Sequence, residues 1–200
     1  MKNYAIYYSY KEIGDVVIIL FDNAKNATSS IRKNRVSVIY HNDEIIGYNI
    51  FDIKDIIKIK SEGMIYFPSN VLVSIINSVL QNEKLETLEY KTSSGYLIAQ
   101  VDEIKGIDNE KSLLSLSIGN DIFHSVVKNC SLKTGDKVVI VQEGTFLNNG
   151  EMFKETNYEN IKINAHVCTG VELGITNIDG ILSLDNDSVI GDDFFLLEEK

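Results

Sequence analysis

The chain has 200 residues, of which 44% are apolar and 24% charged, and its formal net charge is −10. This is the composition of a globular protein that can build a core, as one large or two small domains. It has no run of eighteen apolar residues, which excludes a transmembrane helix, and residues 1–4 lack the charged lead of a signal peptide. We therefore expect a cytoplasmic protein with no membrane partner.

Residues 1–92 have the pattern of an α+β domain, an antiparallel sheet with a covering helix. Apolar alternation or an apolar run predicts strands over residues 4–8, 15–21, 35–40 and 45–53, with 56–60 open between strand and helix. A helix should begin at Pro68-Ser69-Asn70, because Ser69 or Asn70 can cap its free first-turn amides. Its apolar stripe would face the sheet and comprises Val71, Leu72, Ile75, Ile76, Val79 and Leu80.

A polar stretch at residues 91–95 marks the boundary to a second domain, residues 93–200. Strand patterns follow over residues 95–104, 113–118, 123–128, 138–141 and 161–167, with a loop over 144–156. Short strands at regular spacing favour a small, closed, all-β barrel.

The sequence offers neither a catalytic nor a metal-binding motif. It has no C-x-x-C or H-x-x-x-H pair, no G-x-S-x-G, no Walker A loop and no G-x-G-x-x-G. We expect a protein that is not an enzyme and holds no cofactor or metal. Cys130 and Cys168 are the only cysteines; two buried, reduced thiols are expected, with one disulfide as the alternative.

The charge is distributed unevenly along the chain. Residues 1–92 carry eleven basic and eleven acidic side chains, whereas residues 93–200 carry eight basic and eighteen acidic ones. A polyanion would gain little from counterion release on the second half unless its few lysines gather on one face.

The second half nevertheless contains motifs of a nucleic-acid-binding family. Its strand patterns and the stretch Val-Cys-Thr-Gly-Val-Glu-Leu-Gly-Ile at residues 167–175 resemble the tRNA-binding domain appended to bacterial methionyl- and phenylalanyl-tRNA synthetases. That domain is an oligonucleotide-binding (OB) fold, and the resemblance covers residues 95–197. With residues 12–17 and 44–51, the whole chain resembles stand-alone bacterial proteins that join an uncharacterised α+β domain to it. The resemblance implies non-catalytic binding of tRNA or another structured RNA, a role in translation, and a homodimer.

The resemblance also implies the contact residues, which lie in three loops. They are Asn109, Lys111, Lys128, Asn129, Ser131, Lys133, Thr169 and Glu172. The chain departs from the family pattern in each loop. A His-Pro segment is missing before Lys111, residues 127–135 replace the family's Cys-Gly-Ala-x-Asn, and Glu159 stands where the family has arginine. A carboxylate there repels phosphate. The alternative is that these are solvated turns and that only the structural part of each motif is kept.

Two further sets of residues could contact RNA. Aromatic side chains that could stack on bases are Tyr96, Phe123, Phe146, Phe153 and Tyr158; the alternative is that they belong to the core, as most aromatic residues of a small barrel do. The densest basic cluster, Arg32-Lys33-Asn34-Arg35, is followed by Lys54, Lys58 and Lys60; it is either a solvated loop or a share of the RNA contact. The rival function is a protein-interaction or dimerisation module, an OB fold whose RNA face has degenerated.

Overall fold

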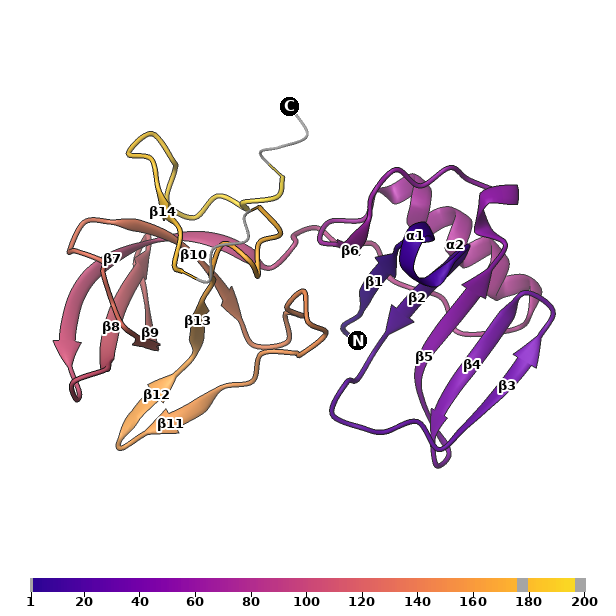
Figure 1. Cartoon of the computed structure of the whole chain (residues 1–200), viewed down its shortest axis with the longest axis horizontal. Helices are drawn as coiled ribbons and strands as arrows, with labels where there is room; N and C mark the ends of the chain where they lie inside the picture. The colour runs from indigo at the N-terminus through magenta and orange to yellow at the C-terminus, as the bar shows by residue number, and fades with distance from the viewer. Residues whose placement is uncertain (1, 176–179, 197–200) are drawn as a thin grey trace. The chain divides into compact units, whose positions relative to one another are not determined.

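The computed structural model describes residues 2–175 and 180–196; residue 197, where the resemblance ends, lies outside them. The chain is mostly antiparallel β-sheet and divides into two compact units, Met1–Thr92 and Ser93–Lys200, hereafter the N-terminal and C-terminal units (Figure 1). Among the described residues, no helix has the length and apolar character needed to span a membrane.

The N-terminal unit is built on a six-stranded antiparallel sheet with the strand order β3-β4-β5-β2-β1-β6. Its strands are β1 (Ala5–Tyr8), β2 (Val16–Leu20), β3 (Ser29–Lys33), β4 (Val36–His41), β5 (Glu44–Phe51) and β6 (Gly63–Ile65). Two short helices, α1 (Tyr10–Ile13) and the 3-10 helix η1 (Ile53–Asp55), lie in the connections. Strands β3 and β6 were not predicted because both are short edge strands with no alternation of apolar residues; β3 is largely exposed, and two of the three residues of β6 are half-buried.

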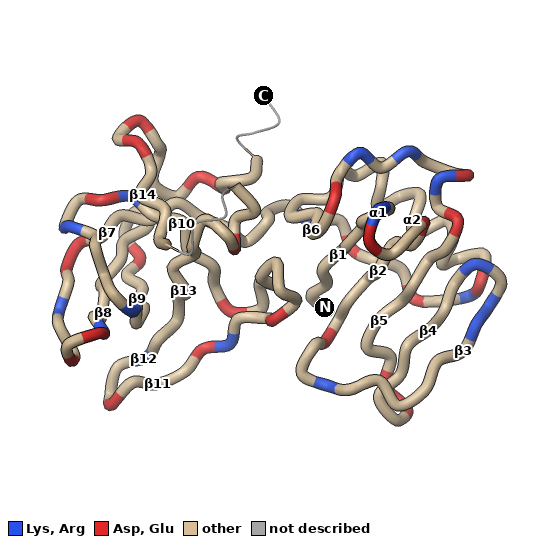
Figure 2. The backbone as a smooth tube through the Cα atoms, in the orientation of Figure 1, with Lys and Arg blue, Asp and Glu red and all other residues tan. Residues whose placement is uncertain are grey.

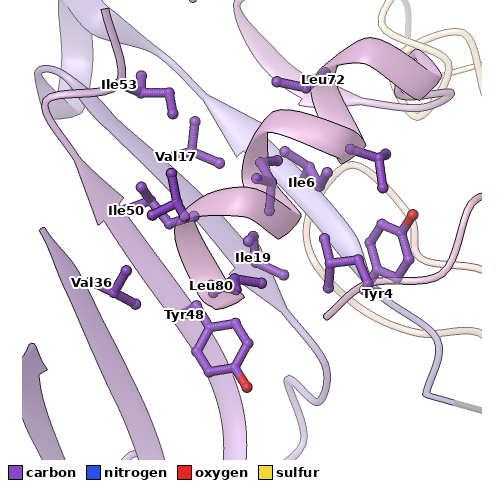
Figure 3. Close-up of a cluster of buried hydrophobic side chains, with 14 of the residues drawn as sticks. Tyr4, Ile6, Val17, Ile19, Val36, Tyr48, Ile50, Ile53, Leu72 and Leu80 are labelled. Atoms are coloured by element: carbon purple, nitrogen blue, oxygen red, sulfur yellow. The ribbon is translucent and has the colours of Figure 1, made fainter. Parts of the chain in front are cut away.

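Helix α2 (Asn70–Asn82) begins where its cap predicts, since Ser69 Oγ accepts the Leu72 amide at 3.3 Å. It buries Leu72, Val73, Ile76, Val79 and Leu80 in one core cluster with strand residues such as Ile19 and Ile50 (Figure 3). The predicted stripe was wrong at Val71, which is 64% exposed. At 3.6 residues per turn, Val71 lies roughly 140° from Ile76, whereas Val73 lies within the buried arc.

The C-terminal unit contains a second antiparallel sheet, with the strand order β13-β10-β7-β8-β9. Its strands are β7 (Tyr96–Gly106), β8 (Lys111–Ile118), β9 (Asp121–Lys128), β10 (Lys137–Gln142) and β13 (Ala165–Val167), with β14 (Ser183–Leu184) paired to β10. Strands β11 (Thr156–Tyr158) and β12 (Ile161–Ile163) form a separate hairpin. The single strand predicted over 161–167 is therefore interrupted, at Asn164.

Asn164 joins the two edge strands of this sheet. Its side-chain oxygen accepts the His124 amide of β9 at 2.8 Å, and its own amide donates to the His124 carbonyl at 3.2 Å. The next residue along the chain begins β13, so the sheet curls until its edges meet. The enclosed core contains apolar residues from all five strands, among them Val101, Leu116, Val127, Ile140 and Val167.

Both cysteines are free, so the disulfide alternative is wrong. Cys168 is buried, and burial together with the nearby Glu172 carboxylate raises the pKa of its thiol. Cys130 is half-buried and packs against the apolar core of the same unit.

Candidate nucleic-acid interface

Two of the predicted contact residues lie directly opposite each other. Strands β8 and β9 pair so that Lys111 faces Lys128 across the ladder. Both side chains point away from the core, because Val127, which neighbours Lys128, belongs to the core cluster and successive strand residues alternate between faces. Two ammonium groups side by side repel each other, and an anion placed between them removes that repulsion.

A third lysine joins this pair although sequence reasoning missed it. Lys105 of β7 is opposite Leu113, two residues from Lys111 on the same face of β8. In a regular strand Lys105 would share the inward face of Val101, but the β7–β8 register shifts between Val101 and Glu103. This bulge turns Lys105 outward. Lys105, Lys111 and Lys128 are hereafter the lysine cluster.

The loop beside the lysine cluster is held by an aspartate. The Asp108 carboxylate accepts the amides of Glu110 and Lys111 at 2.8 and 2.7 Å, and these two bonds lower its pKa. The negative charge of Asp108 is therefore partly offset by two backbone N–H groups. The Asn129 amide donates to the Glu110 carbonyl at 2.7 Å, which brings the predicted contact residues Asn109 and Asn129 into adjoining loops.

Ser131 and Lys133 lie further along the loop that connects β9 to β10. Both are exposed, while Leu132 between them is buried in the core. The Lys133 amide donates to the Asp136 carboxylate at 2.8 Å, in a turn that is bonded to Val101 near the middle of β7. Lys133 therefore lies beside the bulge, and no strand pairing places it within the lysine cluster among the residues described.

Thr169 and Glu172 form a turn that binds its own polar groups. The Glu172 carboxylate accepts the Thr169 amide at 2.7 Å and the Thr169 hydroxyl at 2.9 Å, and it lies 2.9 Å from His166 Nε2. Burial raises the pKa of Glu172, but the bonds from His166 and Thr169 outweigh burial and lower it overall. This arrangement supports a structural role for the retained Glu-Leu-Gly motif.

Two of the five candidate stacking rings are unavailable to bases. Tyr96 is fully buried and donates its hydroxyl to the Phe146 carbonyl at 2.8 Å, and Phe146 is itself 2% exposed. The expectation that either could be a platform is wrong, because both rings belong to the interior. Phe123 packs against the core, and Phe153 and Tyr158 are half-buried.

Acidic residues surround the lysine cluster (Figure 2). Glu103 pairs with Ser115 on the same outward face as Lys105, and Glu110 is exposed in the adjoining loop. Other side chains on this face include Gln100, Ser117, Ile122, His124 and Val126. Ile122 is 62% exposed. The interface is thus a small basic site within an acidic unit.

Comparison with protein families gives a match in the N-terminal unit. A family model described as a domain of unknown function, DUF4479, matches residues 23–90, which lie within the N-terminal unit. None of the curated proteins matches the chain.

Proposed function

We propose that the C-terminal unit is an OB fold that binds tRNA or another structured RNA in the cytoplasm, without catalysing a reaction. Numbering its five sheet strands by chain order, neighbours run 5-4-1-2-3, and Asn164 brings strand 5 back to strand 3. That circular order supports a five-stranded OB barrel.

The observation that carries the proposal is the position of the lysine cluster. It lies on the outward face of the second and third strands, beside the loop that joins the first and second. OB folds bind oligonucleotides on this face and with this loop. Lysines hold a phosphate backbone without reading base sequence, so we expect recognition of RNA shape and charge.

The three lysines of the cluster, taken by themselves, predict weak binding with a measurable salt dependence. For three phosphate contacts the logarithm of the association constant falls with log salt at a slope of about −2.1 to −2.7. Between 50 and 200 mM salt the affinity should therefore fall by about 20- to 40-fold.

The test is a filter-binding titration of the full chain against bulk tRNA at several salt concentrations. Lys111→Gln together with Lys128→Gln should lower the slope by about 1.4 to 1.8, because two phosphate contacts are lost. The matched control is Lys2→Gln with Lys25→Gln, whose ammonium groups already pair with carboxylates in the N-terminal unit. Equal slopes for the two double variants would contradict the proposed site.

Ile122 favours the second candidate function, a protein-interaction or dimerisation module. Its side chain is 62% exposed on the same outward face, next to His124 and near Val126, in a unit whose charge repels polyanions. Under this alternative, sedimentation velocity should show a dimer that persists at high salt and is lost in Ile122→Asp. RNA binding by a monomer would favour the first function.

A further inference from the structure

Three connections of the N-terminal sheet leave it at the same end. Strand pairing places the end of β1 beside the start of β2, and the start of β2 beside the end of β5. The β3–β4 turn belongs to this end too, because Val36 pairs with Ile50. Helix α1, the β3–β4 hairpin and residues 52–62 therefore lie together. They carry seven of the eleven basic residues of residues 1–92, here called the basic edge: Lys11, Arg32, Lys33, Arg35, Lys54, Lys58 and Lys60.

Specific contacts hold these connections to one another. The Lys54 ammonium lies over the Tyr10 ring of α1, and the Lys54 amide donates to the Asp15 carboxylate at 3.1 Å. Arg35, in the hairpin turn, donates to the Asp52 carbonyl at 2.8 Å. These contacts connect the three segments that carry the basic edge.

Carboxylates at this end do not cancel the positive charge. The same connections contain five: Glu12, Asp15, Asp52, Asp55 and Glu62. Asp15 accepts bonds from Tyr8 and Lys54, and Asp55 lies 3.9 Å from Arg35. Glu83, which follows the last residue of α2, accepts a hydrogen bond from Asn34 in the β3–β4 turn. Residues 1–92 are neutral as a whole, so this end has a local excess of cations (Figure 2).

Residues 57–60 give this surface a row of cations. Ile57 and Ile59 pack against the core, and Lys58 and Lys60 between and after them are exposed. This alternation indicates a locally extended segment, in which residues two apart lie about 6.6 Å from each other, a spacing comparable to that of successive phosphates along an extended RNA strand. Arg32 adds a planar donor, held 3.7 Å above the Phe51 ring.

From this geometry we propose that the basic edge is a second RNA-binding surface, which contacts the phosphate backbone mainly through Lys58 and Lys60. The proposal rests on the proposed function for its ligand class. Tyr10, Ile13 and Ile56 are 43–49% exposed nearby, but they come from a four-residue helix and a separate loop. An interfacial membrane helix instead presents one continuous apolar face, so RNA is the better fit.

The experiment uses the full chain with Lys58→Gln and Lys60→Gln, titrated with bulk tRNA over a salt series. The slope of the log association constant against log salt should fall in magnitude by about 1.4 to 1.8. If the variant and the wild type bind equally at 1 M salt, the variant then binds about 25- to 60-fold more weakly at 0.1 M. Lys2→Gln with Lys25→Gln is again the charge-matched control. Thermal unfolding should not change, since both lysines are exposed.

The outcomes separate this inference from the barrel site. If Lys58→Gln/Lys60→Gln binds like the wild type while Lys111→Gln/Lys128→Gln is weaker, the basic edge is refuted and the proposed function stands. The reverse result refutes the barrel site and supports the basic edge. A wild-type chain that does not bind tRNA overturns both, as does binding to phosphatidylserine vesicles in place of tRNA.

Discussion

Glu172 tests whether the retained Glu-Leu-Gly motif is structural or contacts RNA. The Glu172 side chain is 19% exposed and accepts two hydrogen bonds from Thr169. Its other carboxylate oxygen lies 2.9 Å from His166 Nε2. Hydrogen bonds to a charged group contribute about 1.5–3 kcal/mol and neutral ones about 0.5–1.5 kcal/mol. Glu172→Gln keeps one acceptor and loses the charge, so we expect it to cost about 2 kcal/mol at pH 7.

The cost should depend on pH in a defined direction. The pKa of Glu172 is lower in the folded chain than its ordinary value, so the ionised form stabilises the fold. That contribution is complete above about pH 4.3, the ordinary pKa of glutamate. It is lost as pH falls through the lowered folded value. The difference between wild type and Glu172→Gln should therefore shrink toward acid pH.

The assay is urea unfolding of the full chain at pH 7 and at acid pH, with hydrogen exchange of residues 165–175 to localise the effect. A structural role predicts faster exchange there in Glu172→Gln and an unchanged tRNA affinity. Unchanged exchange with altered tRNA affinity would refute this reasoning and return Glu172 to the contact surface.

Two further substitutions test the scaffold of each unit. Asn77 pairs with both backbone groups of Leu88, at 2.7 and 2.8 Å, so Asn77→Ala should cost about 2 kcal/mol in urea unfolding; an unchanged free energy of unfolding would contradict the pairing. Gly95 has φ +84°, and a Cβ there would meet Thr145 Oγ1 at 2.5 Å. Gly95→Ala should lower the melting temperature, and adding Thr145→Ala should restore it only in part, because the backbone strain remains.

Parts of the fold that follow from local chemistry could be predicted. Ser69 before an apolar helical period identifies the start of α2, and alternation identifies central strands such as β5 and β8. The edge strands β3 and β6 could not be found in this way, since Ser29–Lys33 is almost wholly exposed. The hydrogen bond from the His124 amide to the Asn164 side chain joins the two edge strands of the second sheet, although the residues are forty positions apart in the sequence. No pattern in the neighbouring residues predicts this contact.

In the candidate site, too, local sequence indicates some features while others depend on strand pairing. Lys111 and Lys128 could be proposed from their loops, but their direct pairing depends on the β8–β9 register. Lys105 was hidden because strand alternation places it with Val101 on the inner face, and only the bulge reverses this. The Asp108 carboxylate accepts two backbone amides beside Lys111, an arrangement that the sequence does not indicate.

Under the proposed function, the acidic C-terminal unit would bind RNA weakly through the lysine cluster alone, because three contacts release few counterions and eighteen carboxylates oppose them. A second weak surface in the same chain changes this balance. Once one surface holds an RNA, the other meets it at an effective concentration set by the chain, where both can reach the same molecule. Binding would then select RNAs large enough to meet both surfaces. Under the two proposals, the basic residues of the N-terminal unit would compensate for the low number of basic residues in the C-terminal unit.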